Sequence, residues 1–96
     1  MAVYFVIYYN ITDSGRFMEY FQAVMPVILR CGGRLVVEGV PEAIEGTLSF
    51  KQAVVFEWPS RKDLLEYWHS EEYAEIRKLR EGAAEFQAVV IEGAQL

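Results

Sequence analysis

Four segments of this chain have the composition of β-strands, and in each segment both alternating sets of side chains are largely apolar. They are residues 2–9, 34–40, 52–58 and 87–93, which are rich in valine, isoleucine and aromatic residues. Successive side chains of a strand point to opposite faces of a sheet. A sheet built from these segments therefore has two faces that both need cover, one from the chain's own helices and the other from a partner.

Two helical patterns lie between the strand segments. The first begins at a capping residue within Thr12–Ser14, and its apolar side chains recur at spacings of four, three and four residues: Phe17, Phe21, Val24 and Ile28. Pro26 lacks a backbone N–H and predicts a kink in this helix or the end of its regular part. Gly32 and Gly33 predict its C-terminal cap, where a positive φ is needed.

The second pattern predicts two short helices in succession. Ser60, followed three residues later by Asp63, predicts the cap of a helix that runs to about His69. Ser70 predicts the cap of the next helix, whose first turn carries acids, and Gly82 interrupts it. The resulting order β-α-β-β-α(α)-β predicts an α+β fold of the ferredoxin-like type, with an antiparallel four-stranded sheet.

Strand parity predicts which side chains share each face of the sheet. The set assigned to the helix side is wholly apolar: Phe5, Ile7, Tyr9, Leu35, Val37, Val54, Phe56, Trp58, Val89 and Ile91. The opposite set has an apolar centre: Tyr4, Val6, Tyr8, Val36, Ala53, Val55, Ala88 and Val90, with Arg34, Glu38, Glu57 and Glu92 nearer the strand ends. A bulge in one strand would exchange its two sets.

The second face predicts self-association. Its apolar centre covers several hundred Å² or more, which is at or beyond what monomers leave exposed. At about 25 cal/mol per Å², covering this area contributes on the order of 10 kcal/mol before the costs of association. Packing two sheets back to back with two-fold symmetry covers it, so the sequence predicts a homodimer through the sheet face.

Length and composition narrow the class of protein. Ninety-six residues suit a single domain, residues 1–96. A net charge of −5 makes a nucleic-acid partner unexpected, because binding to phosphates needs clustered lysine and arginine residues.

Cys31 is the only cysteine, so no internal disulfide forms and a reducing compartment is favoured. The sequence has no signal-peptide pattern and no run of 18 apolar residues, and we expect a cytoplasmic protein without a membrane partner.

One histidine and one cysteine are too few for the common metal sites. Gly32-Gly33 follows a helix rather than preceding one, so it is not a phosphate-binding loop. We therefore expect no metal and no cofactor.

An ordered set of motifs carries a family resemblance. "CGGRLVVEG", "IEG", "VVFEWPS", "W-x-S-x-E-Y", "LREGAAE" and "VVIEG" follow one another between about Tyr4 and Gly93. In this order they resemble small bacterial proteins of the domain of unknown function 1330 family, in the dimeric α+β-barrel superfamily. The chain departs from the family at Cys31, where an aromatic residue is usual. It departs again at "SFKQ", which lacks the family's proline and arginine and puts any anion site on that loop in doubt.

The resemblance implies a fold and a dimer but no single chemistry. The wider superfamily includes cofactor-free monooxygenases, muconolactone-type isomerases, haem-degrading enzymes and ligand-sensing domains. Function therefore has to be argued from individual residues.

Two residues are candidates for moving a proton. His69 has a pKa range suited to proton transfer near neutrality, although a position at a helix junction is also typical of an exposed linker residue. Glu57 lies between Phe56 and Trp58, so a buried carboxylate there needs a partner, for which Arg34 and Arg80 are candidates. An ion pair that holds sheet and helix together is the alternative interpretation of Glu57.

Tyr73, Arg77 and Arg80 are spaced i, i+4 and i+7, which places them on one helical face. A phenol and guanidinium groups on one face predict a site for a small anionic ligand, with Arg34, Tyr73 and Arg80 as its residues. Neighbouring glutamates offer the alternative of a solvated, ion-paired surface, which we favour for Arg77. Ser70 is interpreted as a cap and not as a nucleophile, because no triad partner is evident.

Two hypotheses of different class remain. One is a cofactor-independent enzyme that acts on a small organic molecule, with Glu57 or His69 moving the proton. The other is a non-catalytic dimer that binds a small ligand or serves a structural role. A deep pocket that contains Glu57 or His69 would favour the enzyme, whereas closed ion pairs at these residues would favour binding or structure.

Overall fold

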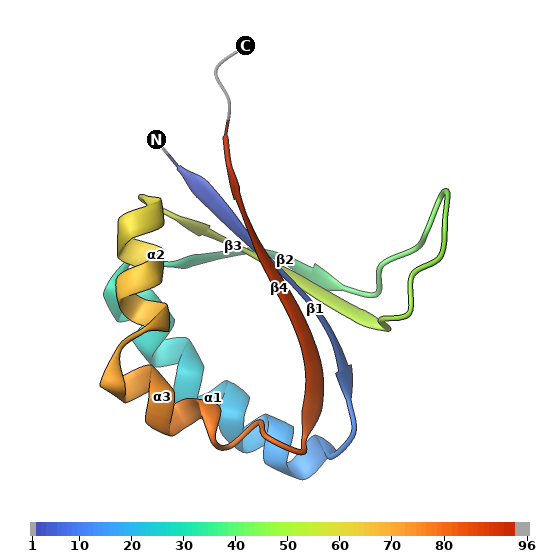
Figure 1. Cartoon of the computed structure of the whole chain (residues 1–96). Coiled ribbons are helices and arrows are strands. Elements are labelled where there is room, and N and C mark those ends of the chain that lie inside the picture. The colour runs from blue at the N-terminus through green and yellow to red at the C-terminus, as the bar shows by residue number, and fades with distance from the viewer. Residues whose placement is uncertain (1, 94–96) are drawn as a thin grey trace.

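The computed structural model describes residues 2–93 and shows a four-stranded sheet with its helices on one side (Figure 1). The elements are β1 (Val3–Ile11), α1 (Ser14–Cys31), β2 (Arg34–Gly39), β3 (Gln52–Trp58), α2 (Arg61–Trp68), α3 (Glu71–Arg77) and β4 (Ala84–Glu92). The strand order is β2-β3-β1-β4, and every neighbouring pair is antiparallel. The predicted α+β, ferredoxin-like fold is confirmed, while the ends of the predicted domain, residues 1 and 94–96, lie outside the described residues.

Side-chain caps begin all three helices. In each case the capping side chain accepts a hydrogen bond at 3.1 Å from the backbone N–H three residues later, and the capping residues are Asp13, Ser60 and Ser70. These bonds satisfy backbone donors that a helix leaves unpaired at its first turn. The predicted caps at Ser60 and Ser70 are confirmed, and Asp13 is the cap within Thr12–Ser14.

Pro26 does not end α1, and Gly33 differs from its prediction. The helix continues through Pro26, whose side chain lies at the surface, and ends at Cys31. Gly32 has the expected positive φ of 108° and caps the helix, but Gly33 does not have a positive φ. Gly33 is needed for space: a Cβ there would lie 2.6 Å from Cγ2 of Ile28 and 2.8 Å from the Trp58 ring.

The core lies between the sheet and the helices. β1 and β3 bury alternate side chains there, as parity predicts: Val3, Phe5, Ile7, Tyr9, Val54, Phe56 and Trp58. Trp58, Tyr73 and Leu64 are the largest side chains that are fully enclosed. Helix-facing positions of the two central strands were therefore assigned correctly from the sequence.

The predicted faces of β4 are wrong. Residues paired across an antiparallel ladder share a face; Phe5 pairs with Val90 and Tyr4 with Ile91. Ala88 and Val90 therefore face the helices, whereas Val89 and Ile91 are 40% and 53% exposed on the other side. Glu92 pairs with the buried Val3 and so also belongs to the helix side.

A β-bulge exchanges the faces of β2 partway along the strand. Leu35 pairs with Phe56 of the helix side, but after a register shift Val37 pairs with Val55 of the opposite side. One extra residue in a strand reverses the alternation beyond it. Val37 therefore points away from the helices and Glu38 toward them, the reverse of the predicted assignment.

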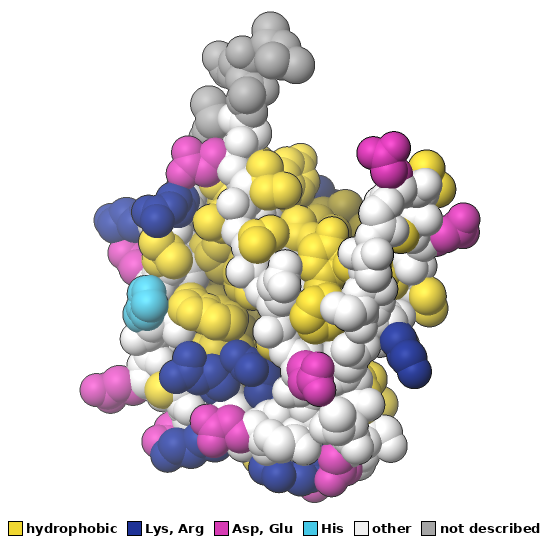
Figure 2. Space-filling model, turned by 45° about the vertical axis from the view of Figure 1, so that its right-hand side comes forward, with side chains coloured by type: hydrophobic (Ala, Val, Ile, Leu, Met, Phe, Trp, Pro, Cys, Tyr) yellow, Lys and Arg dark blue, Asp and Glu magenta, His cyan; other side chains and the backbone are white. Residues whose placement is uncertain are grey.

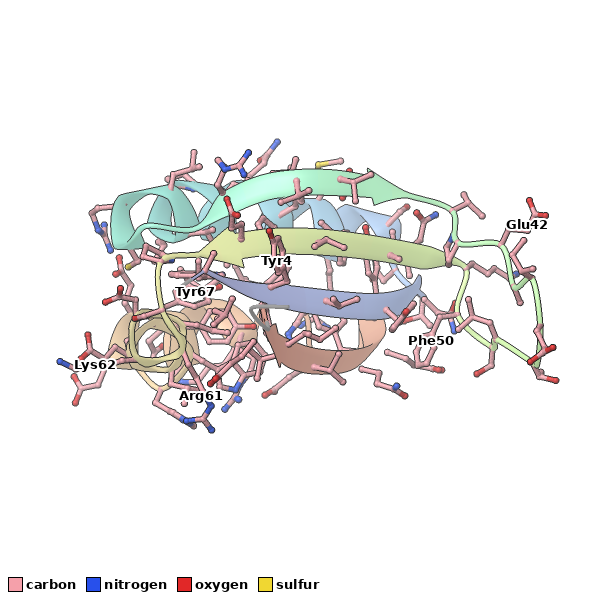
Figure 3. All side chains as sticks on the ribbon, turned by 90° about the horizontal axis from the view of Figure 1, so that it is seen from above. Tyr4, Glu42, Phe50, Arg61, Lys62 and Tyr67 are labelled. Atoms are coloured by element: carbon pink, nitrogen blue, oxygen red, sulfur yellow. The ribbon has the colours of Figure 1, made fainter. Side chains whose placement is uncertain are left out.

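The sheet face away from the helices, which we call the far face, carries an apolar centre. Its residues are Tyr4, Val6, Tyr8, Val37, Ala53, Val55, Val89 and Ile91. Figure 2 shows apolar side chains gathered beside the loop that projects from the sheet between β2 and β3. Tyr4 points outward from this face in Figure 3. The correction to β2 and β4 changes which residues form the face but leaves it apolar.

Candidate functional site

Arg80 lies half-buried in a cluster of aromatic side chains beyond the end of α3. Its Nε donates a hydrogen bond of 3.4 Å to the hydroxyl of Tyr73, and that hydroxyl lies 2.9 Å from the hydroxyl of Tyr20. The guanidinium carbon is 4.2 Å from the centre of the Phe86 ring and 5.9 Å from those of Tyr20 and Trp68. Aromatic faces attract cations, so these rings hold the guanidinium in place.

Local structure explains how Arg80 reaches this position. The Ser70 cap starts α3 so that Tyr73 falls in its first turns with 0% exposure. After Arg77, a series of turns follows, in which the N–H groups of Ala83 and Ala84 donate to the carbonyl of Arg80. Tyr73 and Arg80 therefore meet, as their spacing predicted, although Arg80 lies beyond the helix and not on its face.

Arg80 takes part in none of the ion pairs within residues 2–93. Five other basic residues in this range have a carboxylate partner: Arg30, Arg34, Arg61, Lys62 and Lys78. A guanidinium that is partly removed from water without a carboxylate partner is able to bind an anion from solution.

An apolar groove of about 190 Å³ lies between α2 and the edge strand β4. Its lining residues are Phe5, Leu64, Leu65, Trp68, Ala88 and Val90. Phe86, Ala88 and Val90 alternate along one face of β4, and the small side chain of Ala88 stands between the two larger ones. Arg80 does not line the groove itself, but its guanidinium carbon lies 5.9 Å from the centre of the Trp68 ring, which does.

A second, smaller cavity of about 40 Å³ lies in the core and is almost entirely apolar. This volume suffices for water but not for an organic ligand. Phe5 and Trp68 line both the cavity and the groove, so their side chains separate the two spaces. The indole N–H of Trp58, which also lines the cavity, is buried without a hydrogen-bond partner among residues 2–93.

Three tyrosines in the core have raised pKa values. Burial raises the pKa of Tyr9 to about 12, with a further contribution from the negative charge of Glu38, to which its hydroxyl donates at 3.1 Å. Burial also raises the pKa of Tyr20, and the neighbouring Tyr73 raises it further. Burial likewise raises the pKa of Tyr67. All three phenols are therefore neutral hydrogen-bonding groups at physiological pH.

This arrangement predicts a loss of stability at alkaline pH. The folded state keeps the Tyr9 proton up to a pKa of about 12, whereas the unfolded chain releases it near 10. Between these values the unfolded state binds fewer protons, so the free energy of unfolding falls as pH rises. Urea unfolding at a series of pH values above 10 measures the decline. Tyr9→Phe should make the decline shallower within this window, and an identical slope in both proteins would contradict the assignment.

Glu57 forms a closed ion pair on the far face. Arg34 Nε donates to its Oε1 at 3.1 Å, a second bond comes from Nη2 of Arg34, and Tyr4 donates to Oε2 at 3.1 Å. The hydrogen bonds from Arg34 and then Tyr4 lower the pKa of Glu57. Arg34 is thus the partner and Arg80 is not. The bonds join β2, β3 and β1, so they do not link sheet and helix.

His69 lies exposed at the C-terminal end of α2, the single cyan side chain at the surface in Figure 2. Its side chain makes none of the hydrogen bonds or ion pairs within residues 2–93. The five predicted site residues therefore fall into three places: Glu57 with Arg34, Tyr73 with Arg80, and His69 alone. The catalytic roles of Glu57 and His69 stay predictions.

Sequence reasoning missed three residues that shape the site. Phe86 was missed because the fourth strand was predicted to start at residue 87, although it starts at Ala84. Ala88 and Glu38 were assigned to the opposite face. Phe86 is aromatic and lies two positions before Ala88, so it continues the alternation of Ala88 and Val90. This pattern could have indicated that the strand starts before residue 87.

Within residues 2–93, no cluster of histidine, cysteine, aspartate and glutamate has the arrangement to hold a metal ion. No helix in the same range is both long enough and apolar enough to cross a membrane.

The antiparallel β2-β3-β1-β4 sheet, covered by helices on one face and apolar on the other, defines a ferredoxin-like α+β protein with a groove along one edge. The chain belongs to the family described as "Domain of unknown function (DUF1330)", whose model matches residues 2–94. No curated protein matches the chain at a significant level.

Solved structures share the fold at low sequence identity. A protein of unknown function from Rhodopseudomonas palustris has a TM-score of 0.81 and 17% identity, with 99% of this chain and 84% of that chain covered. A dimeric, ferredoxin-like protein of unknown function from Bacteroides fragilis has a TM-score of 0.67 and 15% identity, with 96% of each chain covered. SnoaB, a cofactor-independent oxygenase from Streptomyces nogalater, has a TM-score of 0.71 and 10% identity, with 99% of this chain and 95% of that chain covered. These identities establish a common fold and nothing about chemistry.

Proposed function

We propose that this protein is a homodimer that binds a small organic anion, a carboxylate on a compact apolar or aromatic body, in the groove between α2 and β4. The observation that carries this proposal is the half-buried guanidinium of Arg80, which has aromatic neighbours and no carboxylate partner within residues 2–93. The apolar body would contact Trp68 and Leu64, and the carboxylate would accept hydrogen bonds from Arg80.

The groove favours binding over catalysis. None of the residues that line it is a carboxylate or a histidine, so no general base faces a bound molecule there. Glu57 is held in an ion pair on the opposite face of the sheet, and His69 is exposed to solvent. Tyr73, with 0% exposure, would act by positioning Arg80 and not by contacting the ligand.

One observation supports a second candidate, a cofactor-independent enzyme. The Tyr20–Tyr73–Arg80 chain of hydrogen bonds ends in a cation that would also stabilise negative charge as it develops on a substrate oxygen. SnoaB shows that this fold can support a cofactor-independent oxygenase. The enzyme would still need a proton acceptor. Glu57 and His69 are the candidates, and neither of them lines the groove.

The dimer is supported by the far face and by relatives. Eight mostly apolar side chains form the face, and several of them are more than one-third exposed in a single subunit. Such a continuous patch is typical of an interface. Structural neighbours from Bacteroides fragilis and Jannaschia are described as dimeric with a ferredoxin-like fold. The single cysteine further supports a reducing compartment such as the cytoplasm.

Thermal-shift measurements with matched ligand pairs test the anion site. Benzoate and phenylacetate should raise the melting temperature, whereas the neutral benzamide and phenylacetamide should not. Arg80→Met should weaken benzoate binding by roughly ten- to a hundredfold, because a charge-assisted hydrogen bond contributes about 1.5–3 kcal/mol. Arg77→Met makes the same change outside the groove and should leave binding intact.

Two further variants separate this proposal from the alternative sites. Glu57→Gln and His69→Ala should retain the benzoate shift if the ligand binds at Arg80. Loss of the shift in either variant, with retention in Arg80→Met, would place the ligand at Glu57 or His69 and would contradict a site at Arg80. Equal shifts from the acids and their amides would contradict an anion site.

A further inference from the structure

The loop of residues 40–51, which we call the projecting loop, exposes large apolar side chains. It joins β2 to β3 without helix or strand and extends well beyond the sheet, with Glu42 toward its outer end (Figures 1 and 3). Ile44 is 89% exposed, Val40 is 77% exposed and Leu48 is 36% exposed. An irregular loop would normally show polar residues to water, so these side chains indicate a surface that is covered in the working protein.

The base of the projecting loop is tied to the far face. The side chain of Asn10 donates to the carbonyl of Ser49 at 3.1 Å and accepts from the N–H of Lys51 at 2.8 Å. The Phe50 ring lies 6.2 Å from the ring of Tyr8, a residue of the far face. The apolar surface of the face therefore continues into the loop.

The position of the loop identifies what can cover it. In Figure 1 the projecting loop extends on the side of the sheet away from the helices. The helices and the core of the same subunit lie on the other side of the sheet, so Ile44 and Val40 cannot reach that core. A body that packs on the far face is within the reach of the loop.

We propose that the projecting loop packs against the second copy of the chain and enlarges the interface formed by the far face. This inference rests on the proposed dimer. Under two-fold symmetry this contact forms twice, because the loop of each subunit contacts the other subunit. Ile44 and Val40 supply the apolar contacts, and Asn10 holds the base of the loop.

A photo-crosslink tests where the loop lies. The photoreactive residue p-benzoylphenylalanine at position 44 should give covalently linked dimers on illumination. The same residue at position 62, on the exposed side of α2, should not. Crosslinks confined to one chain at position 44, in a protein that sediments as a dimer, would overturn the inference.

A matched pair of substitutions measures the contribution of the loop. Ile44→Ser should raise the dimer dissociation constant at least about tenfold, because burying an isoleucine contributes roughly 1.5–3 kcal/mol. Leu29→Ser removes another exposed aliphatic side chain, from α1 on the helix side, and should leave the constant unchanged. Unchanged dissociation in both variants would overturn the role of the loop but leave the dimer in place. A wild-type protein that is monomeric throughout would overturn the dimer itself.

Discussion

Val55→Glu is expected to convert the protein into a folded monomer. Val55 lies at the centre of the far face, where it pairs with Val6 on one side and Val37 on the other. In a two-fold dimer the substitution places two unpaired carboxylates in an apolar interface, each of which loses several kcal/mol of hydration. The dissociation constant should rise by roughly a thousandfold or more, which corresponds to about 4 kcal/mol. Sedimentation velocity at micromolar concentration measures the change.

The control is Leu29→Glu, which adds the same charge at an exposed position of α1. It should sediment as the wild type does. Circular dichroism should show that both variants keep the fold, because neither position is fully buried within one subunit. Identical sedimentation of Val55→Glu and the wild type would show that the far face is not the interface.

Gly33→Ala should destabilise the fold strongly although it adds a single methyl group. That carbon would lie 2.6 Å from the Ile28 side chain and 2.8 Å from the Trp58 ring, both in the core. Forcing extra atoms into a packed core costs about 1–3 kcal/mol. The melting temperature should fall by roughly 4–8 °C for each kcal/mol.

Gly39→Ala is the matched control, since a Cβ at Gly39 has no neighbour within 4 Å and its φ is not positive. Its melting temperature should stay close to that of the wild type at the same protein concentration. A similar loss in both variants would indicate an effect of glycine replacement in general and would contradict the close-packing explanation.

Much of the fold follows from local chemistry that the sequence displays. Ser60 and Ser70 begin helices because their hydroxyls accept backbone hydrogen bonds, and such short-range bonds need no information about the rest of the chain. The buried faces of β1 and β3 were assigned correctly from strand parity. Pro26 was harder to predict, because a long helix stabilised by tertiary packing tolerates a proline at its surface.

The outer strands depend on long-range pairing, and their faces were assigned incorrectly. In β4, Ala88, Val89, Val90 and Ile91 are all apolar, so alternation gives no parity, and the register with β1 decides it. In β2 the bulge after Leu35 reverses the alternation, and nothing in its run of apolar residues marks the extra residue. These errors concealed Ala88 and Glu38 from the site.

The candidate site was only partly predictable for a related reason. The spacing of Tyr73 and Arg80 correctly indicated that the two would meet. The aromatic rings around Arg80 come from α1, α2 and β4, so only tertiary structure brings them together. Arg34, one of the two partners that the sequence suggested for Glu57, lies directly across the ladder from it.

The bulge in β2 also makes this edge of the sheet less suited to pairing with further strands. β2 is an outer strand of the sheet, and a regular outer strand offers unpaired N–H and C=O groups to any passing strand. The shift between Leu35 and Val37 breaks that regular array and twists the strand locally. Assembly along this edge into a continuous cross-β stack is thereby discouraged, which suits a protein whose proposed contact closes on itself after two subunits.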